Sequence, residues 1–295
     1  MANIRELDKR RKSIRNIRKI TRTMELIATA RFKKAMDRAA AANDYTMRMA
    51  QIVRDLANAG LETSHPLLEK RPEVRSATML MLTSNRGLCG GYNSAVIRAA
   101  MQRRDQLRSQ SAELDLEISG KRGISAMKFR SIPIDRTYTQ FEDEPAFEEV
   151  AEIADRLMEE FISRRIDRLD IAYTRFISIS KQEAVVETLL PFSQPEEEQP
   201  HQDEQKQLVV NYEFLPSAES ILEEVVPASF RVKLFKCFLD AAVSEQIARM
   251  IAMKSATENA GEIIKQLSMT YNRARQSKIT GEIMEIIGGV EALNK

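Results

Sequence analysis

The chain of 295 residues has no tryptophan, two cysteines and two histidines, and these scarcities exclude several kinds of protein. Cys89 and Cys237 can form neither a disulfide framework nor a four-cysteine zinc site. With only His65 and His201 available, a metal site would need carboxylates. Aromatic residues make up 6% of the chain, which argues against a stacking platform for single-stranded nucleic acid. We therefore expect reduced, cytosolic thiols and no bound metal or other cofactor.

Strong charge imbalance and long apolar runs are also missing. Lys and Arg number 45 and Asp and Glu number 43, so the net charge of +2 is too small for a general polyanion binder. No run of about 18 apolar residues exists, which predicts no membrane-spanning segment. Residues 1–20 are basic without an apolar core, which predicts no signal peptide.

Proline is absent from both ends of the chain, because all nine prolines lie between Pro66 and Pro227. A proline in a helix interior costs about 3 kcal/mol, so two long proline-free ends permit two long helices. We predict an N-terminal helix over 1–60 and a C-terminal helix over 228–295. At 1.5 Å per residue these rods would be roughly 80–90 Å long.

The apolar residues of the first stretch follow the spacing of a coiled coil. Leu7 and Ile14 lie seven residues apart. The next apolar residues step by three, four and three, a narrow seam that predicts packing against one partner helix: Ile17, Ile20, Met24 and Ile27. The last stretch also has mostly helical spacing, so the economical partner is the other rod, paired antiparallel. The alternative is that each rod breaks into shorter bundle helices.

Antiparallel pairing keeps the sum of facing residue numbers nearly constant. If the rods meet the central domain near Asn58 and Ala228, that sum is roughly 286, with an error of one or two turns of about 3.6 residues. Ile20 is then predicted to lie near Leu267, and residues from about Ile286 onward to project beyond the partner helix.

The middle of the chain, over 75–215, changes period. Strands are predicted over 76–83, 114–118, 169–180, 183–190 and 207–214, and helices from Asn93 or Ser94 to about 108 and over 147–166. Residues 194–205 are acidic and almost without apolar side chains, which predicts a disordered surface loop. The predicted fold is therefore mixed α+β: a long antiparallel coiled coil of the terminal helices plus a small central α/β sheet domain of Rossmann-like type.

Two local patterns could carry chemistry. The loop from Arg86 to Gly91 follows a strand and precedes a helix, but Tyr92 stands where a P-loop has lysine, so a tight turn is favoured over nucleotide binding. Cys89 lacks a convincing base, which argues against a thiol enzyme. Residues 1–38 hold thirteen Lys and Arg against four Asp and Glu, a local net charge of +9 that favours an acidic partner or a solvated face over nucleic acid.

Four segments resemble the gamma subunit of the F-type ATP synthase, of bacterial type. They are IRNIRKITRTMELIATA (14–30), SNRGLCGGYN (84–93), RMIAMKSATEN (249–259) and YNRARQSKITGEIMEIIGG (271–289), in the expected order. The resemblance implies a non-catalytic central-stalk rotor that couples ion flow to ATP synthesis. Its implied partners are the hexamer of alpha and beta subunits, the epsilon subunit and the membrane c-ring, and its implied location is the cytoplasmic face of the inner membrane, without insertion.

The resemblance also implies which residues touch the beta subunits. They match family positions at Met24, Arg249, Arg275, Gln276, Thr280 and Glu282. Two other classes of function stay open on the residues alone. One is a coiled-coil scaffold or chaperone for acidic proteins, and the other is a cysteine or nucleotide enzyme.

Overall fold

A computed structural model describes residues 4–58, 65–109, 113–141, 144–192 and 218–293, with side chains over 4–41, 65–109, 113–141, 144–192 and 223–290. The chain divides into two compact units. The sheet unit comprises residues 30–248, and the terminal pair comprises residues 1–29 together with 249–295. Each unit is described by itself.

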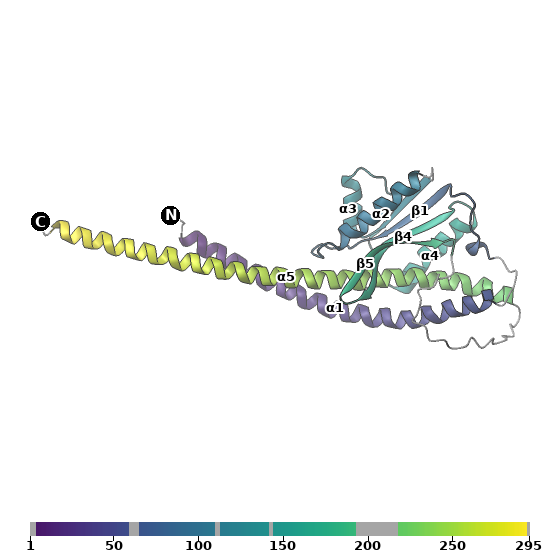
Figure 1. The fold of residues 1–295 in the computed structure, drawn as a ribbon, viewed down its shortest axis with the longest axis horizontal. Coiled ribbons are helices and arrows are strands. Elements are labelled where there is room, and N and C mark those ends of the chain that lie inside the picture. Colours follow the sequence, from purple (N-terminus) through teal and green to yellow (C-terminus); the bar gives the residue numbers. More distant parts are fainter. Residues whose placement is uncertain (1–3, 59–64, 110–112, 142–143, 193–217, 294–295) are drawn as a thin grey trace. The chain divides into compact units, whose positions relative to one another are not determined.

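The sheet unit contains one five-stranded sheet of order β3-β2-β1-β4-β5 (Figure 1). The first four strands are parallel and β5 is antiparallel to β4. The strands are β1 (Ser76–Leu82), β2 (Glu113–Ser119), β3 (Arg136–Tyr138), β4 (Arg168–Ser178) and β5 (Lys181–Leu190). Four of the predicted strands are confirmed, β3 was not predicted, and the strand predicted over 207–214 lies outside the described residues.

Helices cover both faces of this sheet (Figure 1). The helices α2 (Tyr92–Ser109) and α3 (Lys121–Phe129) close an apolar core on one face, around Met79, Met81 and Ile118. On the other face lie α4 (Phe147–Ile162), the short helix η1 (Pro66–Leu68) and part of α5 (Ala218–Leu293). The α/β sheet domain expected from alternating strands and helices is therefore confirmed.

Gly120 holds the carboxyl ends of β1 and β2 together. Its φ of 101° is open to glycine, and a Cβ built there would lie 2.0 Å from the Thr83 carbonyl oxygen. The Thr83 hydroxyl donates to the Ser119 carbonyl and accepts from the Gly123 N–H, at 2.8 and 2.9 Å. The turn that starts α3 is thereby fixed against the end of β1.

The two terminal helices are α1 (Ile4–Asn58) and α5. The predicted N-terminal range agrees with α1, whereas α5 begins ten residues before the predicted 228 and contains Pro227 in its interior. The sequence argument treated proline as a boundary, because it removes one helical hydrogen bond. Val226 and Phe230 on either side are fully buried, and their packing offsets that loss.

In the terminal pair, α1 and α5 run antiparallel. The Thr257 hydroxyl lies 2.8 Å from the Thr21 hydroxyl, and the Arg11 guanidinium lies 4.5 Å from the centre of the Tyr271 ring. As the residue number rises along α1, the number of its neighbour on α5 falls. The predicted antiparallel pairing of the long terminal helices is confirmed.

The seam between the helices differs from the predicted one. On α1 of the terminal pair the buried side chains are Leu7, Thr21 and Ala28, spaced by multiples of seven residues. Ile17, Ile20 and Ile27, predicted to face the partner helix, are instead 47–58% exposed. Thr21 and Ala28 thus take the seam positions next to the partner helix, and these isoleucines lie on the outside.

The register also differs. Contacts join Arg18 to Gly261 and Thr21 to Thr257, so facing numbers sum to about 279 instead of 286. Ile20 therefore lies at the level of residues 258–259, more than two turns from Leu267. Every described side chain over 275–290 is exposed, so the unpaired end of α5 is longer than predicted.

The register predicts a specific cross-link. Cysteines placed at Thr21 and Thr257 should form a disulfide readily, because their side-chain oxygens already touch. A gel shift on mild oxidation, reversed by thiol, measures this. Each single-cysteine variant should give no shift, and a pair at Ile20 and Leu267 should stay reduced. Efficient bonding of the Ile20 and Leu267 pair would show that the register is wrong.

A buried carboxyl on α5 faces a charged cluster on the sheet. Asp240 is 6% exposed, and burial raises its pKa to about 6, with Glu187 adding to the rise and Lys236 opposing it. Glu187 on β5 accepts hydrogen bonds from Tyr173 and Arg175 and lies 3.4 Å from the Lys233 ammonium. The cations of this cluster thus engage Glu187, and Asp240 is easier to protonate when the protein is folded.

This cluster predicts the pH dependence of stability. An aspartate whose pKa rises from 3.8 to about 6 on folding costs about 3 kcal/mol of unfolding free energy when ionised. That loss is absent below about pH 4 and complete above about pH 6. Asp240→Asn should therefore be more stable than wild type in urea unfolding at pH 7.5, and the difference should vanish near pH 4. Equal stability of wild type and Asp240→Asn at pH 7.5 would contradict the raised pKa of Asp240.

Candidate interaction surface

The outward face of the terminal pair carries apolar side chains that no described residue covers. On α1 these are Ile17, Ile20, Leu26 and Ile27, and on α5 Ile251, Ile263 and Met269 are exposed as well. Apolar residues recurring on the exposed side of a paired helix mark a surface for another protein. The sequence pattern located these isoleucines on one face but assigned that face to the wrong partner.

Exposed cations share this segment of α1 with the isoleucines. Asp8 is engaged by Lys12 and Arg11, at 2.9 and 2.6 Å, and these partners hold the pKa of its carboxyl below the ordinary value. Arg22 pairs with Glu25 at 2.7 Å. The remaining exposed cations of this segment include Lys9, Arg10, Arg15 and Lys19. The segment therefore exposes both apolar and positive side chains, which suits an acidic protein partner.

The residues assigned by resemblance all lie on the terminal pair, in two groups. Met24 is half-buried on α1, and Arg249 is buried on α5. The other four are exposed on α5: Arg275, Gln276, Thr280 and Glu282. Twenty-six residues of helix separate Arg249 from Arg275, or about 39 Å. The structure thus brings four of the six onto one short exposed segment and leaves two well away from it.

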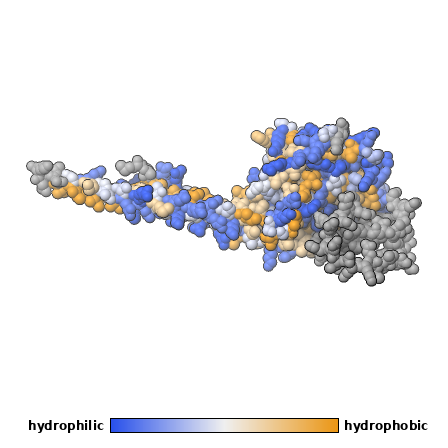
Figure 2. All heavy atoms as spheres, in the orientation of Figure 1, coloured by the Kyte–Doolittle hydropathy of each residue, from blue (hydrophilic) through white to orange (hydrophobic). Residues whose placement is uncertain are grey.

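The exposed segment continues into an apolar end, as the helical spacing of its apolar residues indicates. Figure 2 shows hydrophobic side chains along this part of α5. The large exposed ones are Ile279, Ile283, Met284, Ile286, Ile287 and Val290. Glu282 is one turn from Lys278, at 3.5 Å, and Thr280 and Glu285 are also exposed on this stretch. Exposed apolar side chains this numerous on one helix end mark a surface for another protein.

The glycine-rich loop, in contrast, is closed on itself. The Asn93 side chain accepts from the Ser84 N–H and donates to the Ser84 hydroxyl and the Cys89 sulfur, at 2.9, 2.8 and 3.1 Å. Asn93 therefore ties the loop and does not cap α2, which begins one residue earlier. Gly90 takes the predicted positive φ, and so does Leu88. These polar groups shape a tight turn, as the sequence favoured, and none is directed to a ligand.

The place where doubly wound sheets bind ligands is filled by the protein itself. Such sites lie where the chain reverses direction in the strand order, here between the carboxyl ends of β1 and β4. Tyr92, just after β1, donates its hydroxyl to the Ala241 carbonyl of α5, and Ser244 donates to the Thr174 carbonyl of β4. Helix α5 therefore crosses this position.

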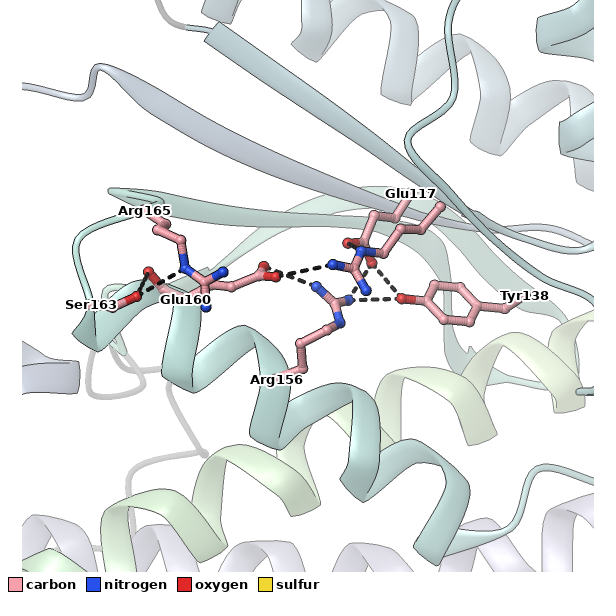
Figure 3. A network of polar contacts seen from close by, with 7 residues as sticks. Glu117, Tyr138, Arg156, Glu160, Ser163 and Arg165 are labelled. Atoms are coloured by element: carbon pink, nitrogen blue, oxygen red, sulfur yellow. Dashed lines mark hydrogen bonds and ion pairs between the residues drawn. The ribbon is translucent and has the colours of Figure 1, made fainter.

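A polar cluster on the sheet is internally satisfied (Figure 3). Glu117 on β2 is buried and accepts hydrogen bonds from Tyr138 on β3 and Arg156 on α4, both at 2.7 Å. Arg156 also bonds Glu160, at 2.9 Å, and Arg136 lies 3.5 Å from that carboxylate. Burial and the Glu117 carboxylate raise the pKa of Tyr138. The cluster anchors the short edge strand β3 and offers no reactive group.

The described residues contain no group of three His, Cys, Asp or Glu side chains placed to hold a metal ion. Among the helices that the structure describes, none combines the length and the apolarity needed to cross a membrane.

Comparison with solved structures finds the same fold in ATP synthases. A chain of the Euglena gracilis mitochondrial ATP synthase (OSCP/F1/c-ring, rotational state 3) matches with a TM-score of 0.65 at 19% identity, over 98% of this chain and 94% of that one. A chain of the Tetrahymena thermophila mitochondrial ATP synthase (central stalk/c-ring) matches with a TM-score of 0.58 at 20% identity, over 80% and 99%. At these identities the likeness concerns the fold.

Comparison of sequences gives the family. The ATP synthase family model matches residues 3–293. The ATP synthase gamma chain of Rhodopirellula baltica is 64% identical over 294 residues, 99% of both chains. That of Leptospira biflexa is 37% identical over the full length of both, and that of Saccharopolyspora erythraea 39% identical over 100% of this chain and 98% of its own. The chain belongs to the ATP synthase gamma chain family.

Proposed function

We propose that this chain is the central-stalk rotor of an F-type ATP synthase, a non-catalytic subunit that couples ion flow to ATP synthesis or hydrolysis. The observation that carries the proposal is the terminal pair: two long antiparallel helices that expose both apolar side chains and cations. Such a pair can be held inside a ring of larger subunits and still present a different side to each of them.

The rotor needs partners at both ends. We place the terminal pair inside the hexamer of alpha and beta subunits and the sheet unit against the epsilon subunit and the membrane c-ring. The chain would then be peripheral, on the cytoplasmic face of the inner membrane. The apolar end of α5, from Ile279 to Val290, would turn within an apolar collar of the hexamer. Apolar contacts lack direction, so such a collar resists rotation little.

Coupling requires contacts that differ from one side of the rotor to another. We assign this role to the six residues found by resemblance, among them Arg275 and Gln276 on the exposed segment of α5. A guanidinium and an amide can exchange one set of hydrogen bonds for another as the rotor turns, because both present several donors. Each beta subunit would then adopt the conformation that the facing side favours.

The composition of the isolated complex tests the proposal against a scaffold or chaperone. An affinity-tagged copy of this chain, expressed in its own cell, should co-purify with three alpha and three beta subunits per copy, because the hexamer has one axis. A chaperone would recover these subunits in variable, substoichiometric amounts. Quantitative mass spectrometry of the solubilised complex decides between them, and recovery without alpha and beta subunits would refute the rotor.

Replacement of Arg275 and Gln276 by alanine should lower coupled ATP synthesis in the assembled complex by several-fold, while assembly stays normal. A charge-assisted hydrogen bond is about twice as strong as a neutral one. Its loss should therefore weaken the contact between the rotor and the beta subunit that it faces. ATP synthesis in inverted vesicles, normalised to complex content, measures this.

Asn272 and Arg273 offer a matched control. They are an exposed amide and an exposed arginine on the preceding turn of the same helix. Alanine at both positions removes the same chemical groups and should leave synthesis near the wild-type rate. Equal effects from the two double variants would mean that the assigned residues have no special role.

A further inference from the structure

Three kinds of contact hold α5 to the rest of the sheet unit. The first is apolar and includes Phe230, Leu234 and Phe238. The second is a set of ion pairs near the surface, such as Arg231 with Asp155 at 2.5 Å and Lys233 with Glu187 at 3.4 Å. The third is the pair of hydrogen bonds between Tyr92 and Ala241 and between Ser244 and Thr174, at 3.2 and 3.3 Å.

The two hydrogen bonds are buried and reciprocal. All four residues are less than a tenth exposed. Helix α2 donates to α5 at Ala241, through the hydroxyl of Tyr92, and α5 donates to strand β4 at Thr174, through the hydroxyl of Ser244. Ala241 and Ser244 are three residues apart and so lie on one face of the helix. Each bond uses a main-chain carbonyl, whose position is fixed by the helix or the strand.

These two buried hydrogen bonds define the orientation of α5 more sharply than the apolar contacts and the ion pairs do. Apolar packing resists large turns of the helix, but it is non-directional and defines small shifts less sharply than a hydrogen bond does. Ion pairs near the surface exchange with water and are weakened by salt. A buried hydrogen bond is lost when either partner moves by about an ångström, and the unpaired group then stays in a dry environment. Turning α5 by one residue, about 100°, would break both bonds at once.

We propose that Tyr92 and Ser244 are positioning residues that lock the rotational and axial register of α5 against the sheet, so that torque passes between sheet and helix without slip. This proposal rests on the rotor function. It assigns to the two hydroxyls a mechanical role that is distinct from the stability supplied by the apolar core.

The test uses the assembled complex carrying Tyr92→Phe, Ser244→Ala, or both. Neither change removes a packed ring or adds volume. Proton pumping and ATP hydrolysis are measured together in vesicles, with and without an opposing proton gradient. Without the gradient the double variant should pump normally. Against it, protons pumped per ATP should fall by at least about twofold, because loss of two buried hydrogen bonds lets slipped registers become populated under load.

Tyr138→Phe is the matched control. It also removes a tyrosine hydroxyl, here a half-buried one, but that hydroxyl bonds Glu117 on β2 and Arg156 on α4 instead of α5. The control should lower the thermal midpoint of the purified chain without changing the ratio of protons to ATP. The conservative change Ser244→Thr, which keeps the hydroxyl, should restore the ratio in the Ser244 series.

The outcomes separate the proposal from the rotor function. If wild-type complex pumps and the double variant keeps its ratio under full load, the lock is refuted and the rotor stands. If pumping and hydrolysis fall in parallel, with the ratio unchanged, the two hydroxyls are structural only and the lock is again refuted. If wild-type complex containing this chain fails to couple at all, the rotor function itself fails.

Discussion

The closeness of α1 and α5 is the constraint on which the terminal pair depends. Their seam includes small and polar residues, such as Ala28, Ala260 and the touching pair Thr21 and Thr257, beside the larger Leu7 and Met253. These residues take the positions between the helices, and Ile17, Ile20 and Ile27, which would line the predicted coiled coil, face outward. The same packing that joins the helices therefore creates the outward apolar face, and structure and interface have one physical cause.

The sheet unit follows from a second use of α5. A doubly wound sheet leaves a crevice where its strand order reverses, and in many proteins a ligand fills it. Here Tyr92 donates to α5 and Ser244 of α5 donates to β4 across that position, and Asn93 beside it bonds Ser84 within the glycine-rich loop. A fold that often binds nucleotides thus binds a helix of its own chain at this position.

Most of the fold could be predicted because its signals are local. The distribution of proline gave two long helices, and the change of period gave four strands of the sheet. The seam could not be predicted in the same way, since Ile20 is more apolar than Thr21 and periodicity alone does not say whether an apolar face meets a helix of the same chain or another protein.

The interior Pro227 was misjudged because the packing of Val226 and Phe230 outweighs its local cost. The short strand β3 depends on the buried Glu117, Tyr138 and Arg156 contacts, which join residues distant in the sequence. For the interaction surface, the residue pattern supplied cations and apolar residues, and only family resemblance singled out positions such as Arg275.

The central claim is that α1 and α5 turn as one rigid body, and a locked complex tests it most directly. A disulfide between cysteines at Thr21 and Thr257 would join the helices within the terminal pair. Single-molecule rotation of the oxidised complex, driven by ATP and compared with the same complex after reduction, is the decisive measurement. The account predicts equal rotation rates in the two states. Rotation that stops on oxidation and resumes on reduction would show that the helices move against each other, and would contradict the rigid rotor.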